Sequence, residues 1–392
     1  MKSIIDSTLY DNHSGELSLG YYQVGNTKHI YKLKALVEAT RQNIHPEWNF
    51  HRDAFSKVNW TISSNTDLRA VYARRAQQLR DQYEHLTLHY SGGSDSYTVL
   101  RAFLDNNIHL DEVFVRWPIK ATEKLYTPNA ADTSTANILS EWDLIIKPDL
   151  EYLRKHHPTI KITVVDWSED ATNLDEFSEE LFDAVGSDFL NFGVFFKHLT
   201  NSDTEKQRFS KGLKTASIFG LDKCRVVKQG NDAFVYFLDI AINMAGSQKN
   251  KNIEPFYWTP SMPDVVKEQA HLVFNYFSAR PELQHLLDFE SYSDPVKKRQ
   301  YDLIVRSLVY PDWNPNKFQA AKGKSAIYTE TDTWLFNQYR GHRILDSWQV
   351  AVKNQLATID KKYIRYNNGV PDGFVGFISP FYQIGGFKQV DH

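Results

Sequence analysis

A short run of serine and glycine between a predicted strand and a predicted helix constrains this chain more than any other feature. The pattern predicts a strand over residues 86–90 and, from the helical spacing of its apolar side chains, a helix over residues 97–107. Residues 91–96, Ser-Gly-Gly-Ser-Asp-Ser, join the two. A strand that passes through such a loop into a helix predicts an anion-binding helix N-terminus at the edge of a sheet.

The residue types of the loop suit phosphate. Backbone N–H groups at the start of a helix have no acceptor within it, and the helix dipole favours an anion there. Gly92 and Gly93 allow positive φ angles and let the backbone approach a phosphate closely. The hydroxyl groups of Ser91, Ser94 and Ser96 can donate to the same oxygens. The loop is therefore predicted to bind phosphate groups.

Asp95 is the one acidic residue of the loop, and it predicts a metal ion. A carboxylate beside phosphates repels them unless a cation lies between the two. Mg²⁺ prefers a carboxylate together with phosphate oxygens. Asp95 is therefore the predicted ligand of Mg²⁺.

Strands and helices alternate from Glu84 onward, which predicts an α/β fold with a parallel twisted sheet and covering helices. Later strands are expected at residues 113–115, 160–166 and 215–219. A hairpin is expected at residues 224–237. After about Asn243 the alternation stops. The expected domains are an N-terminal helical segment (residues 1–83), a nucleotide-binding domain (84–243) and a mainly helical C-terminal domain (244–392).

The flanking regions carry many of the aromatic residues, which make up 14% of the chain. Helical spacing predicts helices near residues 31–37, 67–83, 263–277 and 331–356. Phe256, Tyr257 and Trp258 lie in a proline-bounded segment, where packing is the first interpretation and a stacking wall for a substrate the second. The aromatic flanks are the expected source of substrate choice.

Charge and cysteine content exclude several classes of protein. A net charge of −3 argues against a protein that coats nucleic acid, although short basic runs leave an RNA contact open. A single cysteine, Cys224, excludes a disulfide scaffold and a cysteine-based zinc site within one chain. No apolar run approaches the roughly 20 residues of a membrane helix, and the first ten residues lack the apolar stretch of a signal peptide. A cytoplasmic protein is expected.

Residues 91–96 match the Ser-Gly-Gly-x-Asp-Ser loop of the PP-loop ATP pyrophosphatases and stand between a strand and a helix as in that family. The chain therefore resembles this family, which includes asparagine synthetase, PAPS reductase and tRNA thiolases. Its overall pattern is also similar to that of asparagine-synthase-like PP-loop proteins of bacteriophages. The resemblance covers about residues 84–239. It implies an adenine nucleotide alpha hydrolase-like fold, with ATP and Mg²⁺ as ligands.

The resemblance also implies nucleotide contacts at two other strand ends. Val115 and Arg116, at the end of the second strand, occupy the place that contacts adenine. Near the end of a later strand, Gly220 would allow close backbone approach, Asp222 would hold a second Mg²⁺, and Lys223 would neutralise charge developing on the phosphates. An ordinary turn with a surface Asp–Lys pair explains this later segment equally well.

Most members of the family transfer AMP to a carbonyl or carboxyl oxygen and release pyrophosphate, after which a nitrogen or sulfur nucleophile displaces AMP. Lys2 stands where a glutaminase domain would carry its catalytic cysteine, and two-cysteine thiolase chemistry lacks a second cysteine beside Cys224. The expected function is an AMP-forming ligase without its own glutaminase, which transfers an amine to an unidentified acceptor. A sulfur-transfer or PAPS-reductase-like enzyme that uses Cys224 stays open, as does a non-catalytic nucleotide-binding module. A buried, inert Cys224 is the simpler interpretation.

Overall fold

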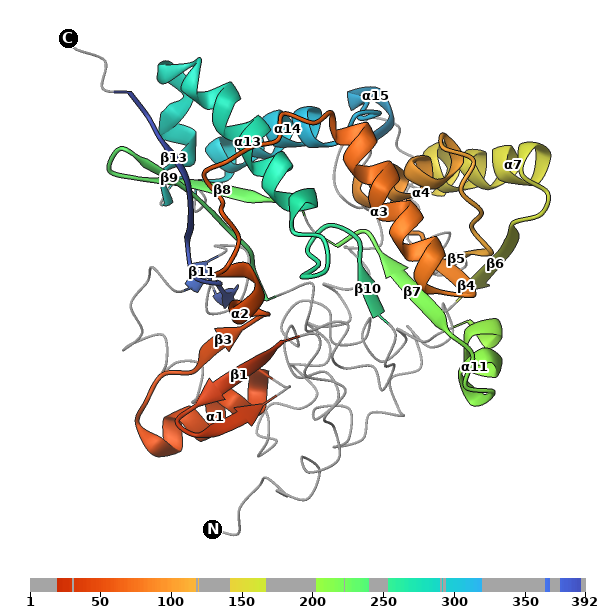
Figure 1. The fold of residues 1–392 in the computed structure, drawn as a ribbon, viewed down its shortest axis with the longest axis horizontal. Coiled ribbons are helices and arrows are strands. Elements are labelled where there is room, and N and C mark those ends of the chain that lie inside the picture. Colours follow the sequence, from red (N-terminus) through yellow and green to blue (C-terminus); the bar gives the residue numbers. More distant parts are fainter. Residues whose placement is uncertain are drawn as a thin grey trace, which may run out of the picture.

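The middle part of the sequence forms a parallel five-stranded sheet in the strand order β10-β7-β4-β5-β6 (Figure 1). Each neighbouring pair is parallel. The strands are β4 (His85–His89), β5 (Glu112–Trp117), β6 (Lys161–Asp166), β7 (Thr215–Phe219) and β10 (Ile253–Pro255). The expected α/β fold class with a parallel sheet and covering helices is confirmed. The computed structural model describes residues 20–29, 32–117, 119, 142–166, 202–221, 223–239, 253–289, 291, 294–318, 364–366 and 374–388.

Two helices, α3 (Leu68–Gln82) and α4 (Ser94–Leu104), pack against each other and against β4. Alternation along β4 points Leu86 and Leu88 into the hydrophobic core. A π-helical turn, Trp142–Ile146, leads into α7 (Lys147–His156). Helix α11 (Asp203–Ser210) contacts β7. Its Glu205 is hydrogen-bonded to His89 and Ser217, which point to the face of the sheet opposite to that of Leu86 and Leu88.

That opposite face is polar, which is unusual for a central parallel sheet. Thr87, Glu112, Thr215 and Ser217 point to it and are fully buried. Such groups are costly to bury unless they are hydrogen-bonded. Helix α11 and its cap supply partners to Ser217 and Glu112, whereas the Thr215 hydroxyl has none among the described residues. The sheet therefore has one apolar face and one face organised by hydrogen bonds.

A small antiparallel sheet, in the order β2-β1-β3, precedes the central sheet. The sequence pattern does not predict it, because strands of three or four residues are too short to show a period. Helix α1 (Lys32–Gln42) lies where a helix is expected, and α2 (Arg52–Phe55) is a single turn. The three strands are β1 (Tyr21–Val24), β2 (Thr27–His29) and β3 (Glu47–Asn49).

The expected hairpin forms from β8 (Arg225–Gln229) and β9 (Asp232–Tyr236). Strand β13 (Tyr382–Gly386) pairs with β9, so the end of the chain returns to this hairpin. The sequence pattern predicts a surface loop there, because it mixes glycine with aromatic residues. Gly385 instead packs on Phe274, where a Cβ would stand 2.6 Å from the ring.

The remaining C-terminal elements are mainly helical. Strand β10 also comes from this part of the chain, beyond Asn243, and it extends the central sheet beside β7. The helix expected at residues 331–356 lies outside the described residues. The other elements are α13 (Asp264–Ser278), a 3₁₀-helix (Pro281–Leu287), α14 (Pro295–Val309), α15 (Pro315–Phe318), β11 (Ile364–Tyr366) and β12 (Phe374–Phe377).

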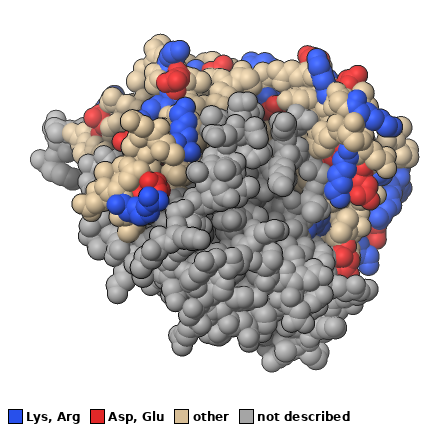
Figure 2. All heavy atoms as spheres, turned by 90° about the horizontal axis from the view of Figure 1, so that it is seen from below, with Lys and Arg blue, Asp and Glu red and all other residues tan. Residues whose placement is uncertain are grey.

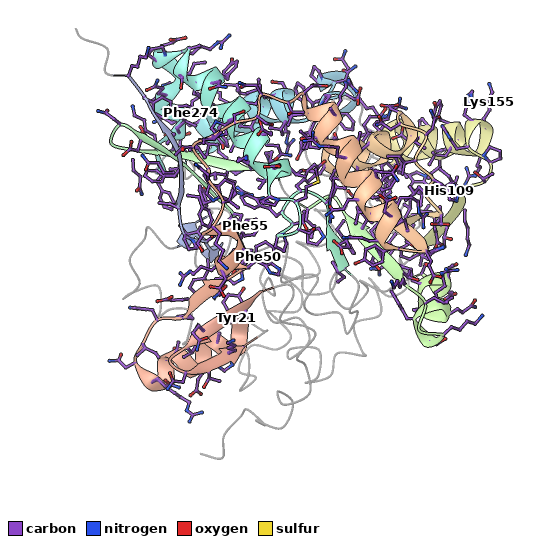
Figure 3. The ribbon with its side chains drawn as sticks, in the orientation of Figure 1. Tyr21, Phe50, Phe55, His109, Lys155 and Phe274 are labelled. Carbon is purple, nitrogen blue, oxygen red and sulfur yellow. The ribbon has the colours of Figure 1, made fainter. Side chains whose placement is uncertain are left out.

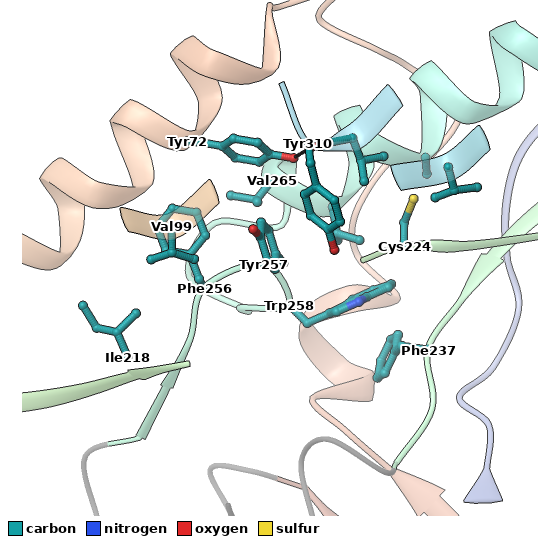
Figure 4. Packing of buried hydrophobic residues seen from close by; sticks show 14 of the residues in the cluster. Tyr72, Val99, Ile218, Cys224, Phe237, Phe256, Tyr257, Trp258, Val265 and Tyr310 are labelled. Atoms are coloured by element: carbon teal, nitrogen blue, oxygen red, sulfur yellow. Dashed lines mark hydrogen bonds between the residues drawn. The ribbon is translucent and has the colours of Figure 1, made fainter. Parts of the chain in front are cut away.

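An aromatic cluster joins the flanking regions. The ring of Phe237, just after β9, lies 4.1 Å from that of Trp258 and 5.6 Å from that of Phe55 (Figures 3 and 4). Phe256 and Tyr257 are also fully buried. The packing interpretation of this segment is confirmed.

No helix among the described residues is long and apolar enough to cross a bilayer. Basic and acidic side chains lie next to each other on the described part of one face (Figure 2). This mixture agrees with a net charge of only −3.

Candidate functional site

The serine–glycine loop lies where the strand order of the sheet reverses. From β4 the chain adds β5 and β6 on one side, and then β7 and β10 on the other. Ligands of open α/β sheets bind at the carboxyl ends of the two strands that flank such a reversal, which here are β4 and β7. The loop follows β4, and Tyr90 fixes its start by donating its backbone N–H to the carbonyl oxygen of Phe114 at 2.9 Å.

Hydrogen bonds within the loop fix its shape. The Ser96 hydroxyl donates to the Gly93 carbonyl oxygen at 3.2 Å and accepts from the backbone N–H of Ser91 at 3.2 Å. Gly92 has a φ of +77°, and a Cβ there would stand 2.6 Å from Ile146 Cγ1. Glycine is therefore required at position 92 by the backbone angle and by the packing against Ile146. The Ser96 hydroxyl is hydrogen-bonded within the loop and stabilises its shape.

Gly93 and the first turn of α4 form the open part of the loop. The first backbone bond of the helix runs from Tyr97 N–H to the Gly93 carbonyl at 3.0 Å, so the preceding N–H groups of Ser94, Asp95 and Ser96 have no acceptor within the helix. A Cβ on Gly93 would meet only Ser91 Oγ, at 3.5 Å. Packing within the described residues does not require glycine at position 93, whereas a phosphate held close to the backbone would.

Alanine substitutions at the two glycines are expected to act differently. Gly92→Ala should lower the free energy of unfolding by about 2 kcal/mol, because the new Cβ overlaps Ile146 and the φ angle is strained. Gly93→Ala, at the N-cap of α4, should lower the free energy of unfolding by at most about 1 kcal/mol and weaken ATP binding by about tenfold, through the clash of the Cβ with a phosphate. Urea unfolding and calorimetric titration with ATP measure the two effects. Unchanged ATP affinity in Gly93→Ala would contradict a phosphate at this position.

Asp95 is half-buried in the first turn of α4 and is held by two tyrosines from distant parts of the chain. Its carboxylate accepts a hydrogen bond from the hydroxyl of Tyr310, and its carbonyl oxygen accepts one from Tyr257 at 2.8 Å. Both rings are buried. Within the part of the chain that the structure describes, no group of three or more His, Cys, Asp or Glu side chains is placed to hold a metal. A cation at Asp95 would therefore depend on phosphate oxygens and water for its other ligands.

The structure brings Gly220 against the loop and places Lys223 farther along. A Cβ on Gly220 would stand 2.8 Å from the carbonyl carbon of Asp95 and the backbone nitrogen of Ser96, so only glycine fits between β7 and α4. The Lys223 side chain is buried, with its Nζ 3.5 Å from Asp302 Oδ1 on α14. Asp222 lies outside the described residues.

Val115 and Arg116 both lie within β5, which continues to Trp117. Val115 is fully buried in the core, so its side chain serves packing. Arg116 is half-buried, and in the strand register it faces Val165 of β6.

A lysine that no sequence pattern indicates lies beside the loop. Lys317, in α15, places its Nζ 2.6 Å from Asp149 Oδ1 and 3.8 Å from the centre of the Tyr97 ring. Asp149 also accepts a hydrogen bond from the hydroxyl of Tyr90, the residue before the loop. Lys317 is 168 residues from Asp149 in the chain, so no local pattern points to this cluster.

Two buried glutamates, Glu112 and Glu205, accept most of the described hydrogen bonds on the polar face of the sheet. Glu112 accepts hydrogen bonds from Thr163 at 2.6 Å and Ser202 at 2.7 Å. Glu205 accepts from the backbone N–H of Ser202 at 2.7 Å and lies 3.2 Å from His89 Nε2. Glu112, directly before the apolar run Val113–Val115 of β5, is the sequence signal for this network.

The pKa of both glutamates is shifted downward. Burial raises the pKa of Glu112, but hydrogen bonds from His85, Thr163 and Ser202 and the charge of Lys161 outweigh it and lower the pKa to about 2. Burial likewise raises the pKa of Glu205, and the nearby His89, together with hydrogen bonds, lowers it below its ordinary value. Both carboxylates are therefore ionised inside the protein at neutral pH.

Cys224 is fully buried, as the simpler interpretation expects. Its backbone N–H donates to Gln269 Oε1 on α13 at 3.0 Å. The thiol therefore lies in the core, where Figure 4 shows it beside the buried aromatic residues.

Comparison with known proteins finds no matching family model and no matching curated protein. Among solved structures, the chain is similar to the U34-tRNA thiolase NcsA from Methanococcus maripaludis, determined with its 4Fe–4S cluster. The identity is 11%, the alignment covers 75% of this chain and 81% of the thiolase, and the TM-score is 0.25. Similarity at this level does not indicate a function, which has to be inferred from the site.

Proposed function

We propose that this protein is an ATP pyrophosphatase-type enzyme that binds ATP and Mg²⁺ at residues 91–96. The position of the loop carries the proposal. It lies at the carboxyl end of β4, beside the end of β7, where the strand order reverses and where open α/β sheets bind their ligands. The N-terminus of α4 supplies N–H donors at that point, and Gly93 leaves room for a phosphate against the backbone.

Different residues of the loop bind the phosphates and the metal ion. The N–H groups of the first turn of α4, with the hydroxyl groups of Ser91 and Ser94, bind the phosphates that leave as pyrophosphate. Asp95 contributes a carboxylate oxygen to Mg²⁺, which neutralises charge on the phosphates when it is bound. Gly220 keeps β7 close to the loop. Near the end of β5, the backbone of Val115 and Arg116 contacts the adenine.

Lys223 and Asp222 complete the proposed site from the segment after β7. Lys223 stabilises charge on the departing pyrophosphate. Its ammonium group now pairs with Asp302, so this role requires it to exchange that carboxylate for a phosphate. Asp222 holds a second Mg²⁺.

The proposed reaction is an AMP-forming ligation. A carbonyl or carboxylate oxygen of the acceptor attacks the α-phosphorus of ATP, the bond from that phosphorus to the bridging oxygen breaks, and pyrophosphate leaves with the electron pair. The nitrogen of an amine then attacks the activated carbon and displaces AMP. Sulfur transfer through Cys224 would require the thiol to reach the substrate, and its complete burial favours the amine.

Product analysis tests the proposal. The protein is incubated with Mg²⁺, ATP labelled at the α-phosphate, and fractionated cell extract as the source of acceptor. Labelled AMP and an equal amount of pyrophosphate are expected in at least one fraction. Tight ATP binding without AMP in any fraction would instead indicate a nucleotide-binding module, and release of ADP would exclude cleavage between the α- and β-phosphates.

A further inference from the structure

One helix outside the central sheet contacts both charged residues that we assign to catalysis. Helix α14 carries Asp302, which lies 3.5 Å from Lys223 Nζ. Tyr310 follows the last residue of α14, and its hydroxyl donates to Asp95 Oδ1. The two contacts lie about two turns apart on α14.

The hydroxyl of Tyr310 is held in place independently of Asp95. The residue is only 1% exposed, and its backbone N–H donates to the Arg306 carbonyl at 3.1 Å. The neighbouring Val309 carbonyl accepts a hydrogen bond from the Tyr72 hydroxyl of α3 at 2.6 Å. The Tyr310 ring also packs beside that of Tyr257, with centroids 6.0 Å apart (Figure 4). Contacts with α3 and with the segment after β10 therefore fix the position of this hydroxyl.

Asp95 has less support of its own. It lies at the first turn of a helix that borders the open part of the loop, and its side chain is only half-buried. A hydrogen bond to an ionised carboxylate is among the stronger ones and restricts the rotation of the side chain. The described contacts of the carboxylate involve Oδ1, which leaves Oδ2 to face a cation.

We propose that Tyr310 is a positioning residue, which holds one oxygen of Asp95 so that the other is directed at the divalent cation of bound ATP. The inference rests on the proposed function and extends it to a residue 215 positions away in the chain. Residues that orient a metal ligand typically contribute about ten- to a hundredfold to metal affinity.

A competing role predicts the opposite effect. If the tyrosine hydroxyl occupied the place of the cation, its removal would strengthen cation binding. If the hydroxyl orients the carboxylate, its removal weakens cation binding, because the side chain then samples other rotamers. The direction of the change separates the two.

The test uses Mn²⁺ as the probe, measured by electron paramagnetic resonance, with an ATP analogue that carries a methylene group between the α- and β-phosphates. Tyr310→Phe is compared with Tyr257→Phe, which also removes one buried hydroxyl. That hydroxyl bonds to the Asp95 carbonyl oxygen and to the Thr98 side chain, and not to the Asp95 carboxylate. We expect Tyr310→Phe to weaken Mn²⁺ binding by about tenfold or more. Tyr257→Phe should stay close to wild type. Affinity for the analogue in EDTA should be the same in all three proteins.

Three other results would contradict the inference, and each points to a different explanation. Unchanged or tighter Mn²⁺ binding in Tyr310→Phe contradicts a positioning role. Equal losses in Tyr310→Phe and Tyr257→Phe, together with weaker binding in EDTA, indicate a general disturbance of α4. A wild-type protein that binds neither the analogue nor Mn²⁺ refutes the proposed function, and the role of Tyr310 with it. Thermal unfolding of each variant verifies that the tyrosine-to-phenylalanine changes leave the fold intact.

Discussion

An Asp95→Asn variant is expected to form AMP about a thousandfold more slowly than wild type, or not at all, while it remains folded. Asparagine has the same shape, and its carbonyl oxygen can still accept the hydrogen bond from Tyr310. It lacks the negative charge of the carboxylate, which is the ligand that Mg²⁺ prefers beside phosphate oxygens. Loss of the metal contact removes several kcal/mol of transition-state stabilisation, and about 4 kcal/mol corresponds to a thousandfold. Initial rates of labelled AMP release at saturating ATP measure the loss.

Asp105→Asn is the matched control. Asp105 caps the other end of α4 and pairs with Arg101 at the surface. Because exposed ion pairs contribute at most about 1 kcal/mol, this variant should keep its turnover and nearly all of its stability. Wild-type turnover in Asp95→Asn would show that the carboxylate holds no essential cation. Equal losses in both variants would point to a general effect on α4.

The core of the site is predictable from sequence because its signals are local. The strand, the glycine loop and the helix of residues 85–104 follow each other directly, and each has its own pattern. The position of the loop at the reversal of strand order is a property of the whole sheet. The pairing of β4 with both β5 and β7 fixes that position, and no window of sequence contains it.

The residues that support the site are not predictable in this way. Tyr257 and Tyr310 reach Asp95 across 162 and 215 residues of chain. Both occur among many buried aromatic residues, and nothing in their local sequence separates the two that bond to the loop from those that only pack. Strand β13 was not predicted for a related reason: its mixture of glycine and aromatic residues suggests a surface loop, whereas Gly385 allows the close approach of Phe274.

Glu112→Gln is expected to lower the free energy of unfolding by about 3 kcal/mol at pH 7. Glu112 is fully buried, and Ser202 joins it to Glu205 by donating its hydroxyl to the first and its backbone N–H to the second. Glutamine keeps the volume but replaces one acceptor oxygen by a donor NH₂ group that faces other donors. It also removes the charge that lies 3.5 Å from Lys161 Nζ and 3.8 Å from His85 Nε2. Urea unfolding of variant and wild type measures the difference.

The difference should depend on pH in a defined window. The pKa of Glu112 falls from an ordinary value of 4.5 to about 2 in the folded protein, so its ionised form stabilises the fold fully above about pH 4.5. As the pH falls from there toward 2, the unfolded chain takes up a proton that the folded protein does not, and the stabilisation is lost. The gap between wild type and Glu112→Gln should therefore be constant from pH 7 to 5 and shrink below that. Glu47→Gln, at an exposed pair with Arg52, should show a small gap throughout. A gap for Glu112→Gln that stayed constant down to pH 3 would mean that this carboxylate titrates in the folded protein as it does in the unfolded chain.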